Sequence, residues 1–212
     1  MILSAEQEAV RLSARKFAVG EIAPHVREWE ASGGPPRDLY RQMGQLGLMG
    51  MIIDPVYGGS GLDFVSYALS IEEIAAVDGG ISNMMAANNS PVALAIERYG
   101  SPEQRQRFLP QLCSGEWLGS IHLTEPHTGS DASAISTRAT RVGDQYVLDG
   151  HKALITAGSS ADVAMIVAVT GSAANKSEIS VFVTPTDNPG YQVVSTERKL
   201  GHRTNDTCQI RF

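Results

Sequence analysis

The spacing of apolar residues changes once along this chain, close to Gly115, and this change limits the possible fold more than any other feature. Up to that point apolar residues recur at every third or fourth position, as in Val10, Ala14 and Phe17, which is the period of an amphipathic helix. Beyond it, short runs rich in Val and Ile alternate with Gly, Asp, Asn and Pro, a pattern typical of strands and turns. Helices followed by segregated strands predict an α+β chain, with an all-α domain over residues 1–115 and a β-domain over residues 116–212.

Helix start signals mark the first domain. Ser4-Ala-Glu-Gln is a capping-box pattern, in which the serine and the glutamine each accept a backbone amide of the first turn. Ser101-Pro-Glu-Gln opens another helix, with Pro102 in its first turn, where a missing N–H costs nothing. We expect the first helix to begin at Ser4 and to be stopped by Pro24, and the last helix to begin at Ser101. A further helix is expected from about residue 82 to residue 96.

Two more helices are predicted between these, each from the residues expected on its buried face. One is closed by Gly47 and carries Leu39, Met43 and Leu46 at helical spacing. The other begins at an Asp63 cap, and its expected buried residues are Phe64, Ala68, Ile71 and Ala75.

The second domain contains predicted strands at residues 145–149, 164–169 and 179–183. Tight hairpin turns are expected at residues 142–145 and 148–151, because both stretches contain Gly and Asp. The small residues at 171–177 predict an exposed loop between strands. The last residues, 209–212, have the composition of a strand, so we expect the chain to be a truncated product.

Composition and charge exclude several classes of protein. A net charge of −6 with no basic half argues against a nucleic-acid surface. No apolar stretch approaches the roughly 18 residues of a membrane helix, and no basic signal-peptide region opens the chain, so we expect a cytoplasmic protein. Cys113 and Cys208 lie far apart and the histidines show no metal-ligand spacing, so neither a disulfide framework nor a metal site is expected.

One short stretch, Leu123-Thr-Glu-Pro-His-Thr-Gly-Ser-Asp131, is more polar than a turn requires. A strand that enters a turn rich in Gly and Ser can direct several backbone amides and hydroxyls at one point, and such nests bind phosphate or carbonyl oxygens. The same residues could equally form a hydrogen-bonded turn capped by Asp131. From the residues alone both interpretations stay open.

Two other features raise the question of ligand binding. The Gly-rich segment 54–62 lacks the GK[ST] ending of a phosphate loop, which favours an ordinary loop. Met84 and Met85 are expected in the core, although their adaptable thioethers could instead line an apolar ligand tunnel. Core positions are also expected for Met43, Met49 and Met51.

Four stretches of the sequence carry a resemblance to a known family. Residues 123–131 resemble the TEPxxGSD signature of the acyl-CoA dehydrogenase family, and Gly150-His-Lys-Ala-Leu-Ile-Thr156 resembles its GxKxWIT segment. Tyr57-Gly-Gly-Ser-Gly-Leu-Asp63 is similar to its YGGxGLD loop, and Lys199-Leu-Gly-His-Arg203 to its KLGxR segment. The four motifs occur in the family's order and spacing over essentially the whole chain.

The resemblance implies a helical N-terminal domain, a β-barrel-like middle domain and a second helical bundle, of which this chain supplies the first two. It implies FAD as the cofactor, bound against the strand and turn of residues 121–130. The implied cofactor-binding residues are Ile121, Leu123, Thr124, Gly129, Ser130, Leu154 and Thr156.

The resemblance also implies roles for some of these residues. The Leu123 backbone and the Thr124 hydroxyl would hydrogen-bond the flavin near its reactive edge and stabilise the negative charge that arrives on reduction. Ser130 would lie where flavin and the CoA thioester meet, and Thr156 would close the other side of the ring. Leu154 stands where the family usually has Trp, so aromatic stacking on the flavin is lost.

The family's reaction removes two hydrogens across the Cα–Cβ bond of an acyl-CoA thioester. A carboxylate takes the α-proton and flavin N5 accepts the β-hydride. The resemblance implies that this base lies beyond residue 212, so we expect the isolated 212-residue polypeptide to be inactive. Glu125 and Asp131 are expected to hold the turn, and residues 83–90 to border the acyl tunnel.

The implied partners are an acyl-CoA ester of fatty acid metabolism, an electron-transferring flavoprotein as electron acceptor, and further copies of the chain in a homo-oligomer. Two alternatives stay open. One is an acyl-CoA oxidase or flavin monooxygenase of the same superfamily, in which reduced flavin meets oxygen. The other is a non-catalytic subunit that binds CoA esters or completes another subunit's site.

Overall fold

The computed structural model describes residues 2–173 and 176–212 and divides them into two compact units. A helical unit comprises the chain up to Leu118 together with Lys199–Asn205. A β-unit comprises Gly119–Arg198 and Asp206–Phe212. The described residues are therefore mixed helix and sheet, as the change of apolar spacing predicts.

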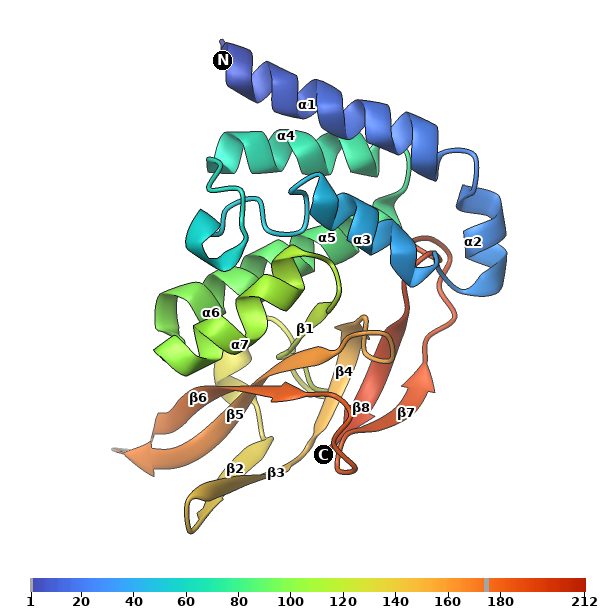
Figure 1. The fold of residues 1–212 in the computed structure, drawn as a ribbon. Coiled ribbons are helices and arrows are strands. Elements are labelled where there is room, and N and C mark those ends of the chain that lie inside the picture. The colour runs from blue at the N-terminus through green and yellow to red at the C-terminus, as the bar shows by residue number, and fades with distance from the viewer. Residues whose placement is uncertain (1, 174–175) are drawn as a thin grey trace. The chain divides into compact units, whose positions relative to one another are not determined.

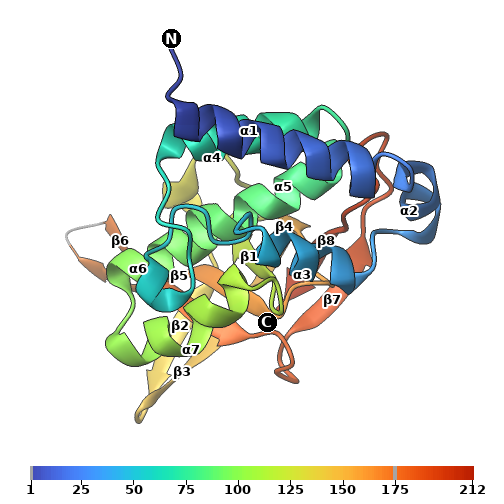
Figure 2. The same ribbon diagram turned by 45° about the horizontal axis from the view of Figure 1, so that its top comes forward.

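The helical unit is built from α-helices, and a longer loop with a short 3₁₀ helix, Pro55–Tyr57, joins α3 to α4 (Figure 1). The helices are α1 (Ala5–Phe17), α2 (Val26–Ser32), α3 (Arg37–Gln45), α4 (Phe64–Ala75), α5 (Gly79–Ala87), α6 (Leu94–Tyr99) and α7 (Pro102–Cys113). A π-helical turn, Ala18–Ile22, extends α1, and a second, Asn88–Ala93, joins α5 to α6. The helices α1 and α4 run side by side in both ribbon views (Figures 1 and 2).

The helix starts follow the capping signals of the sequence. Ser4 and Ser101 form complete capping boxes with Gln7 and Gln104, which confirms both predicted helix starts. Asp63 caps α4 by accepting the amide of Ser66 at 2.7 Å. Helix α2 has no comparable cap: His25 precedes it without a side-chain capping bond, and this helix is absent from the sequence prediction.

The predicted buried face of α4 is wrong. Its buried residues include Ser66, Ser70 and Glu73, whereas Phe64 is 54% exposed and Ala68 lies at the surface. The apolar residues buried on α4 are instead Tyr67 and Ile74. Glu73 can be buried with them because Arg15 on α1 donates two hydrogen bonds to its carboxylate, at 2.6 and 2.7 Å. The side chain expected to be buried at the end of α3 also differs, because Leu46 is 50% exposed and does not lie in the core.

The single helix expected over residues 82–96 is interrupted. Ser90 has extended backbone angles before Pro91, so α5 ends at Ala87 and α6 begins at Leu94. The buried side chain of Asn89 satisfies three buried backbone groups: its amide donates to Leu48 O and Met85 O, and its oxygen accepts the Met51 amide.

The methionine core and the Gly-rich loop are as predicted. Met43, Met49, Met51, Met84 and Met85 are all buried. In the Gly-rich segment the amides of Ser60, Gly61 and Leu62 donate to carbonyls of residues 50–53, so they do not form a phosphate cradle. Gly59 is required there because a Cβ would overlap the Ile53 carbonyl.

The segment Lys199–Asn205 packs within the helical unit, although it follows strands in the sequence. Thr204 Oγ1 donates to the Asp78 carboxylate at 2.6 Å, and the Asn205 amide donates to Gly80 O at 3.1 Å. Lys199 Nζ donates to the Asn205 carbonyl at 2.8 Å. These bonds tie the KLGxR-like segment to the start of α5.

The β-unit contains two sheets. Its strands are β1 (Gly119–His122), β2 (Arg138–Val142), β3 (Gln145–Asp149), β4 (His151–Thr156), β5 (Val163–Ala173), β6 (Lys176–Pro185), β7 (Gln192–Thr196) and β8 (Thr207–Arg211). The larger sheet has the order β1-β5-β2-β3, and β6 pairs with β5 in a long hairpin (Figure 1). The smaller sheet has the order β4-β8-β7, and across the described residues the two sheets do not close into a barrel.

The strand predictions hold at 145–149, 164–169 and 179–183, and β2 and β3 form the predicted hairpin at 142–145. The second predicted hairpin, at 148–151, is wrong. β3 pairs with β2 and β4 pairs with β8, because Gly150 exchanges backbone hydrogen bonds with Phe212 and sends the chain into the other sheet.

The loop predicted at 171–177 is largely strand, since residues 171–173 belong to β5 and residues 176–177 to β6, while residues 174 and 175 lie outside the described residues. The last residues, 209–211, lie in β8 as expected. Among the helices that the structure describes, none has the length and hydropathy needed to cross a membrane.

Candidate functional site

The polar stretch after β1 forms a two-residue turn. Glu125 and Thr128 exchange backbone hydrogen bonds of 2.9 and 3.1 Å around Pro126-His127. Thr128 Oγ1 then donates to Asp131 O at 2.6 Å. Asp131 caps the short 3₁₀ helix Ala132–Ala134 by accepting from the amide and hydroxyl of Ser133. The capped-turn interpretation is therefore confirmed.

A buried ion pair lies beneath this turn. Lys152 Nζ donates to Glu125 Oε1 and to Leu123 O, both at 2.9 Å, and both side chains are almost fully buried. The same carboxylate accepts the amide and hydroxyl of Ser136 at 2.7 Å and the amide of Thr137 at 2.9 Å. Glu125 thus holds three segments of the chain together, as expected for a residue that holds the turn.

The surroundings keep Glu125 ionised. Burial by itself would raise the pKa of Glu125, but the hydrogen bonds from Ser136, Thr137 and Lys152 outweigh burial and hold it well below its usual value. Burial lowers the pKa of Lys152, and the Glu125 carboxylate opposes that effect. A carboxylate with all its lone pairs engaged and a depressed pKa is poorly suited to accept a substrate proton.

Strand β4 lies directly against the turn. Besides the Lys152 contacts, the backbone amide of Ala153 donates to Thr124 O at 2.9 Å. The next residue, Leu154, has φ 57° at an irregularity in the β4–β8 register between Lys152 and Ile155. This left-handed backbone, uncommon for a residue with a Cβ, turns the Leu154 side chain outward, where it is 64% exposed.

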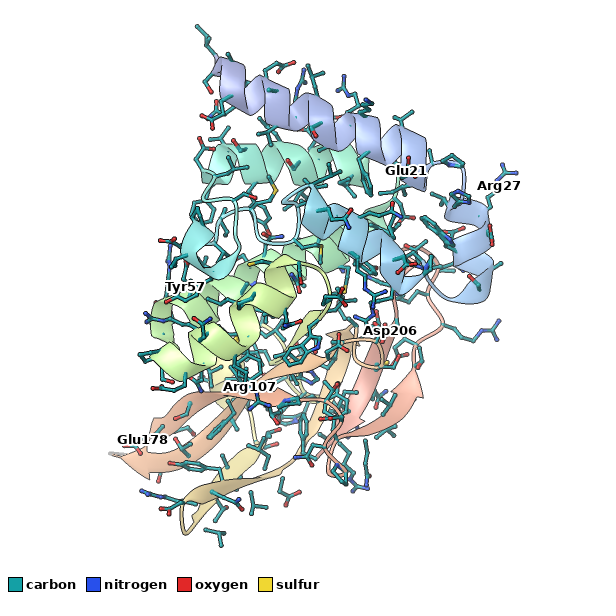
Figure 3. All side chains as sticks on the ribbon, in the orientation of Figure 1. Glu21, Arg27, Tyr57, Arg107, Glu178 and Asp206 are labelled. Atoms are coloured by element: carbon teal, nitrogen blue, oxygen red, sulfur yellow. The ribbon has the colours of Figure 1, made fainter. Side chains whose placement is uncertain are left out.

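The end of β4 is anchored by Asp206, which precedes β8 and is labelled in Figure 3. Its carboxylate accepts the amide and hydroxyl of Ser159 at 2.7 and 2.9 Å and the hydroxyl of Ser160 at 2.6 Å. Burial would raise the pKa of Asp206, yet these hydrogen bonds lower it. The Ala157 amide donates to Asp206 O at 3.0 Å, so Thr156 is held next to a fixed turn.

The sequence-predicted site residues are arranged around this framework. Leu123 and Thr124 lie beside β4, and the Cα of Gly129 faces the Thr124 methyl group, since a Cβ at residue 129 would lie 3.8 Å from it. Ser130 follows at the surface. Ile121 lies within β1 opposite Met165, Leu154 lies on the bulge of β4, and Thr156 lies at the end of β4 opposite Thr207.

The donors available here suit a flavin. Within the described part of the chain, the Thr124 amide and hydroxyl and the hydroxyls of Ser130 and Thr156 have no hydrogen-bond partner. None of these residues is buried, so their donors are open to a ligand. Neutral donors and an exposed apolar side chain such as that of Leu154 are the kinds of group that bind the polar edge and the apolar face of a flavin ring.

Sequence reasoning missed the role of Lys152. The signal that could have revealed it is a lysine inside an otherwise apolar strand, Lys152-Ala-Leu-Ile155, because a buried ammonium needs a carboxylate partner. The structural need for Gly150 is likewise not visible in the motif alone. A Cβ at this position would overlap the Thr137 side chain, so only glycine permits the observed approach.

Comparison with known proteins covers both units. The chain matches the family model of the acyl-CoA dehydrogenase N-terminal domain over residues 4–116 and that of the acyl-CoA dehydrogenase middle domain over residues 120–212. It is 42% identical to the probable acyl-CoA dehydrogenase YngJ of Bacillus subtilis (strain 168) over 209 residues, which are 98% of this chain and 55% of that protein. The chain therefore spans about half the length of that relative.

Solved structures of acyl-CoA dehydrogenases have the same fold as this chain. A glutaryl-CoA dehydrogenase from Mycobacterium smegmatis in complex with FADH2 superposes with a TM-score of 0.92 at 35% identity, covering 99% of this chain and 53% of that one. Butyryl-CoA dehydrogenase from Megasphaera elsdenii superposes with a TM-score of 0.93 at 33% identity, covering 100% of this chain and 56% of that one. Domain models matched end to end and two near-complete superpositions lead to one conclusion: the chain belongs to the acyl-CoA dehydrogenase family.

Proposed function

We propose that this chain forms the N-terminal helical portion, residues 1–115, and the middle β-domain, residues 116–212, of an FAD-dependent acyl-CoA dehydrogenase. One observation carries the proposal: the Thr124 amide and hydroxyl, unpaired within the described residues, lie on a turn that a buried network holds rigid. The FADH2 complex of the glutaryl-CoA dehydrogenase from Mycobacterium smegmatis supports FAD as the cofactor.

When bound, FAD supplies a hydride acceptor for the β-carbon of an acyl-CoA thioester. The protein's own contribution is electrostatic and geometric. The Thr124 amide and hydroxyl would donate to the ring edge where negative charge develops, and Thr156 would donate from the other side. Such donors are already oriented in the described fold, so no reorganisation is needed during the reaction.

The remaining site residues would bind and shield. Gly129, whose α-carbon faces the Thr124 methyl group, would border the ring. Ser130 would contact both the cofactor and the thioester portion of the substrate. Leu154 would cover one face of the ring and exclude water. Neither Glu125 nor Asp131 serves as the base, because each holds backbone groups of the turn.

The proposal extends to the substrate, the electron acceptor and the assembly of the complete protein. The substrate is an acyl-CoA ester of fatty acid metabolism, and electrons leave to an electron-transferring flavoprotein. The complete protein acts as a cytoplasmic homo-oligomer. The base that accepts the α-proton lies outside residues 1–212.

The test uses the protein expressed from its complete gene. It should purify with bound FAD and reduce an artificial dye in the presence of an acyl-CoA, and electron-transferring flavoprotein should replace the dye. Steady oxygen consumption with peroxide formation, and no reduction of the flavoprotein, would instead identify an oxidase. A colourless protein that ignores added FAD and still binds acyl-CoA would identify a non-catalytic CoA-ester-binding subunit.

A further inference from the structure

We propose that Lys152 is a positioning residue for the flavin: its buried ammonium fixes the direction of the Leu123–Thr124 peptide and thereby sets the reduction potential of the bound cofactor. This inference rests on the proposed function. The observation behind it is that the one ammonium joins Leu123 O and Glu125 Oε1, at 2.9 Å each, from inside the β-unit.

The geometry of the peptide bond carries the first step. A trans peptide is planar, so the carbonyl of Leu123 and the amide N–H of Thr124 point in opposite directions. Lys152 Nζ holds the carbonyl on the buried side. The Thr124 N–H therefore points toward the open side of the turn, where it has no partner among the described residues.

A second contact removes the remaining freedom. The Ala153 amide donates to Thr124 O at 2.9 Å, so both carbonyls of the Leu123-Thr124 pair are held by neighbouring residues of β4. With both peptide planes fixed, the Thr124 backbone cannot rotate to follow a ligand. A donor that is held in place before the ligand arrives stabilises developing charge at no cost in reorganisation.

Glu125 makes the buried ammonium possible. An unpaired charge at a fully buried position would shift its pKa and lose its proton, whereas here the carboxylate lies 2.9 Å away. The Glu125 carboxylate is itself held by hydrogen bonds from Ser136 and Thr137, and it therefore keeps the Lys152 ammonium in one position.

Stability alone is a weak reason for such a pair. Replacing a buried ion pair by apolar side chains of similar volume is often neutral or stabilising, because both charges lose their hydration on burial. An apolar residue at 152 could fill the space but could not hold the Leu123 carbonyl. The pair therefore has a role in orienting the turn that packing would not supply.

The experiment compares Lys152→Met, Glu125→Gln and the double variant with the FAD-loaded wild-type protein. For each we would measure the midpoint potential and visible spectrum of the flavin, the dissociation constant of FAD, and the melting temperature of the apoprotein. Glu73→Gln is the matched control, because it breaks another buried carboxylate contact, with Arg15, in the helical unit.

We expect Lys152→Met to bind FAD about 5- to 100-fold more weakly, the range for one lost, well-oriented hydrogen bond. Its midpoint potential should be lower than that of the wild type, because a mobile Thr124 amide stabilises the reduced ring less. The double variant, which buries no charge at 125 or 152, should recover much of the melting temperature but not the potential. Glu73→Gln should lower the melting temperature alone.

Two different results would contradict the positioning role of Lys152 and the proposed function, respectively. If Lys152→Met or the double variant retains the wild-type potential, spectrum and FAD affinity while only the melting temperature changes, the pair is merely structural and the positioning role is wrong. If the wild-type protein itself binds no FAD, the proposed function fails instead. Should Lys152→Met not fold, the double variant gives the same decision.

Discussion

The α-carbon of Gly150 packs against the side chain of Thr137, so closely that a Cβ at residue 150 would overlap Thr137 Oγ1. Thr137 is buried, and its backbone amide donates to Glu125 Oε1 at 2.9 Å. A backbone position in the GxKxWIT-like segment is therefore linked, through one side chain, to the carboxylate that holds the turn.

Gly150→Ala should destabilise the β-unit by about 1–3 kcal/mol, because the added methyl group must displace Thr137 in a packed region. Chemical denaturation followed by tyrosine and tryptophan fluorescence would measure the loss. Gly20→Ala is the control, since nothing lies within 4 Å of a Cβ at that position. Equal stability of the two variants would show that the Gly150 contact relaxes freely.

His122 provides a pH-dependent prediction. It is buried on β1, its Nε2 lies 2.8 Å from Ser120 Oγ, and its ring contacts those of Tyr191 and Phe212. Burial, with a smaller contribution from the Lys152 ammonium, lowers the pKa of His122 from 6.5 to about 3. The folded state therefore requires the neutral imidazole.

The lowered pKa of His122 determines how the stability of the fold changes with pH. Between pH 6.5 and 3 the unfolded chain binds a proton that the folded chain does not, so His122 makes folding less favourable as the pH falls. The contribution is at most about 1.4 kcal/mol per pH unit for one proton. In His122→Gln this dependence should vanish. We therefore expect the difference between the free energies of unfolding of the wild type and of the variant to decrease as the pH falls from 6.5 to 4. Above pH 7 the difference should stay constant. Parallel curves would contradict the prediction.

The sequence predicts local features of this fold better than it predicts partners that lie far apart in the chain. The caps at Ser4, Asp63 and Ser101 depend on residues three positions away, and all three are confirmed. The buried face of α4 includes Glu73, and its partner Arg15 lies 58 residues away in the sequence. No helical period in α4 alone reveals that partner.

The candidate site shows the same limit. The polar turn was visible as a motif, and the hydrogen bonds of Asp131 and Thr128 within it are local. The bonds from Lys152 span 27 and 29 residues and depend on β4 entering a different sheet from β3. β4 enters a different sheet because it pairs with β8, at the far end of the sequence. The hairpin expected at 148–151 would instead have paired β4 with β3.

Asn89 should be among the most sensitive positions of the helical unit. Its side chain satisfies three buried backbone groups at 2.6 to 2.9 Å, those of Met51, Leu48 and Met85. Asn89→Leu keeps the approximate volume but removes every one of these bonds, and each unsatisfied buried group costs about 1–3 kcal/mol. We expect a loss of more than about 3 kcal/mol, or a protein that does not fold, in urea denaturation. Gln106→Leu, at an exposed position of α7, should change stability little.

Thr124→Val tests the flavin contact directly. Valine has nearly the shape of threonine, and the Thr124 hydroxyl has no partner among the described residues, so the fold should be unaffected. What the substitution removes is a donor to the ring, and the unmade bond costs about 1–3 kcal/mol, more in the reduced than in the oxidised state because the reduced ring carries the negative charge. The midpoint potential of the bound flavin should therefore fall, while the melting temperature of the apoprotein stays constant. Thr140→Val, an exposed residue of β2, is the matched control and should change neither quantity. If the potential of Thr124→Val equals that of the wild type and of the control, the hydroxyl does not contact the reactive part of the ring.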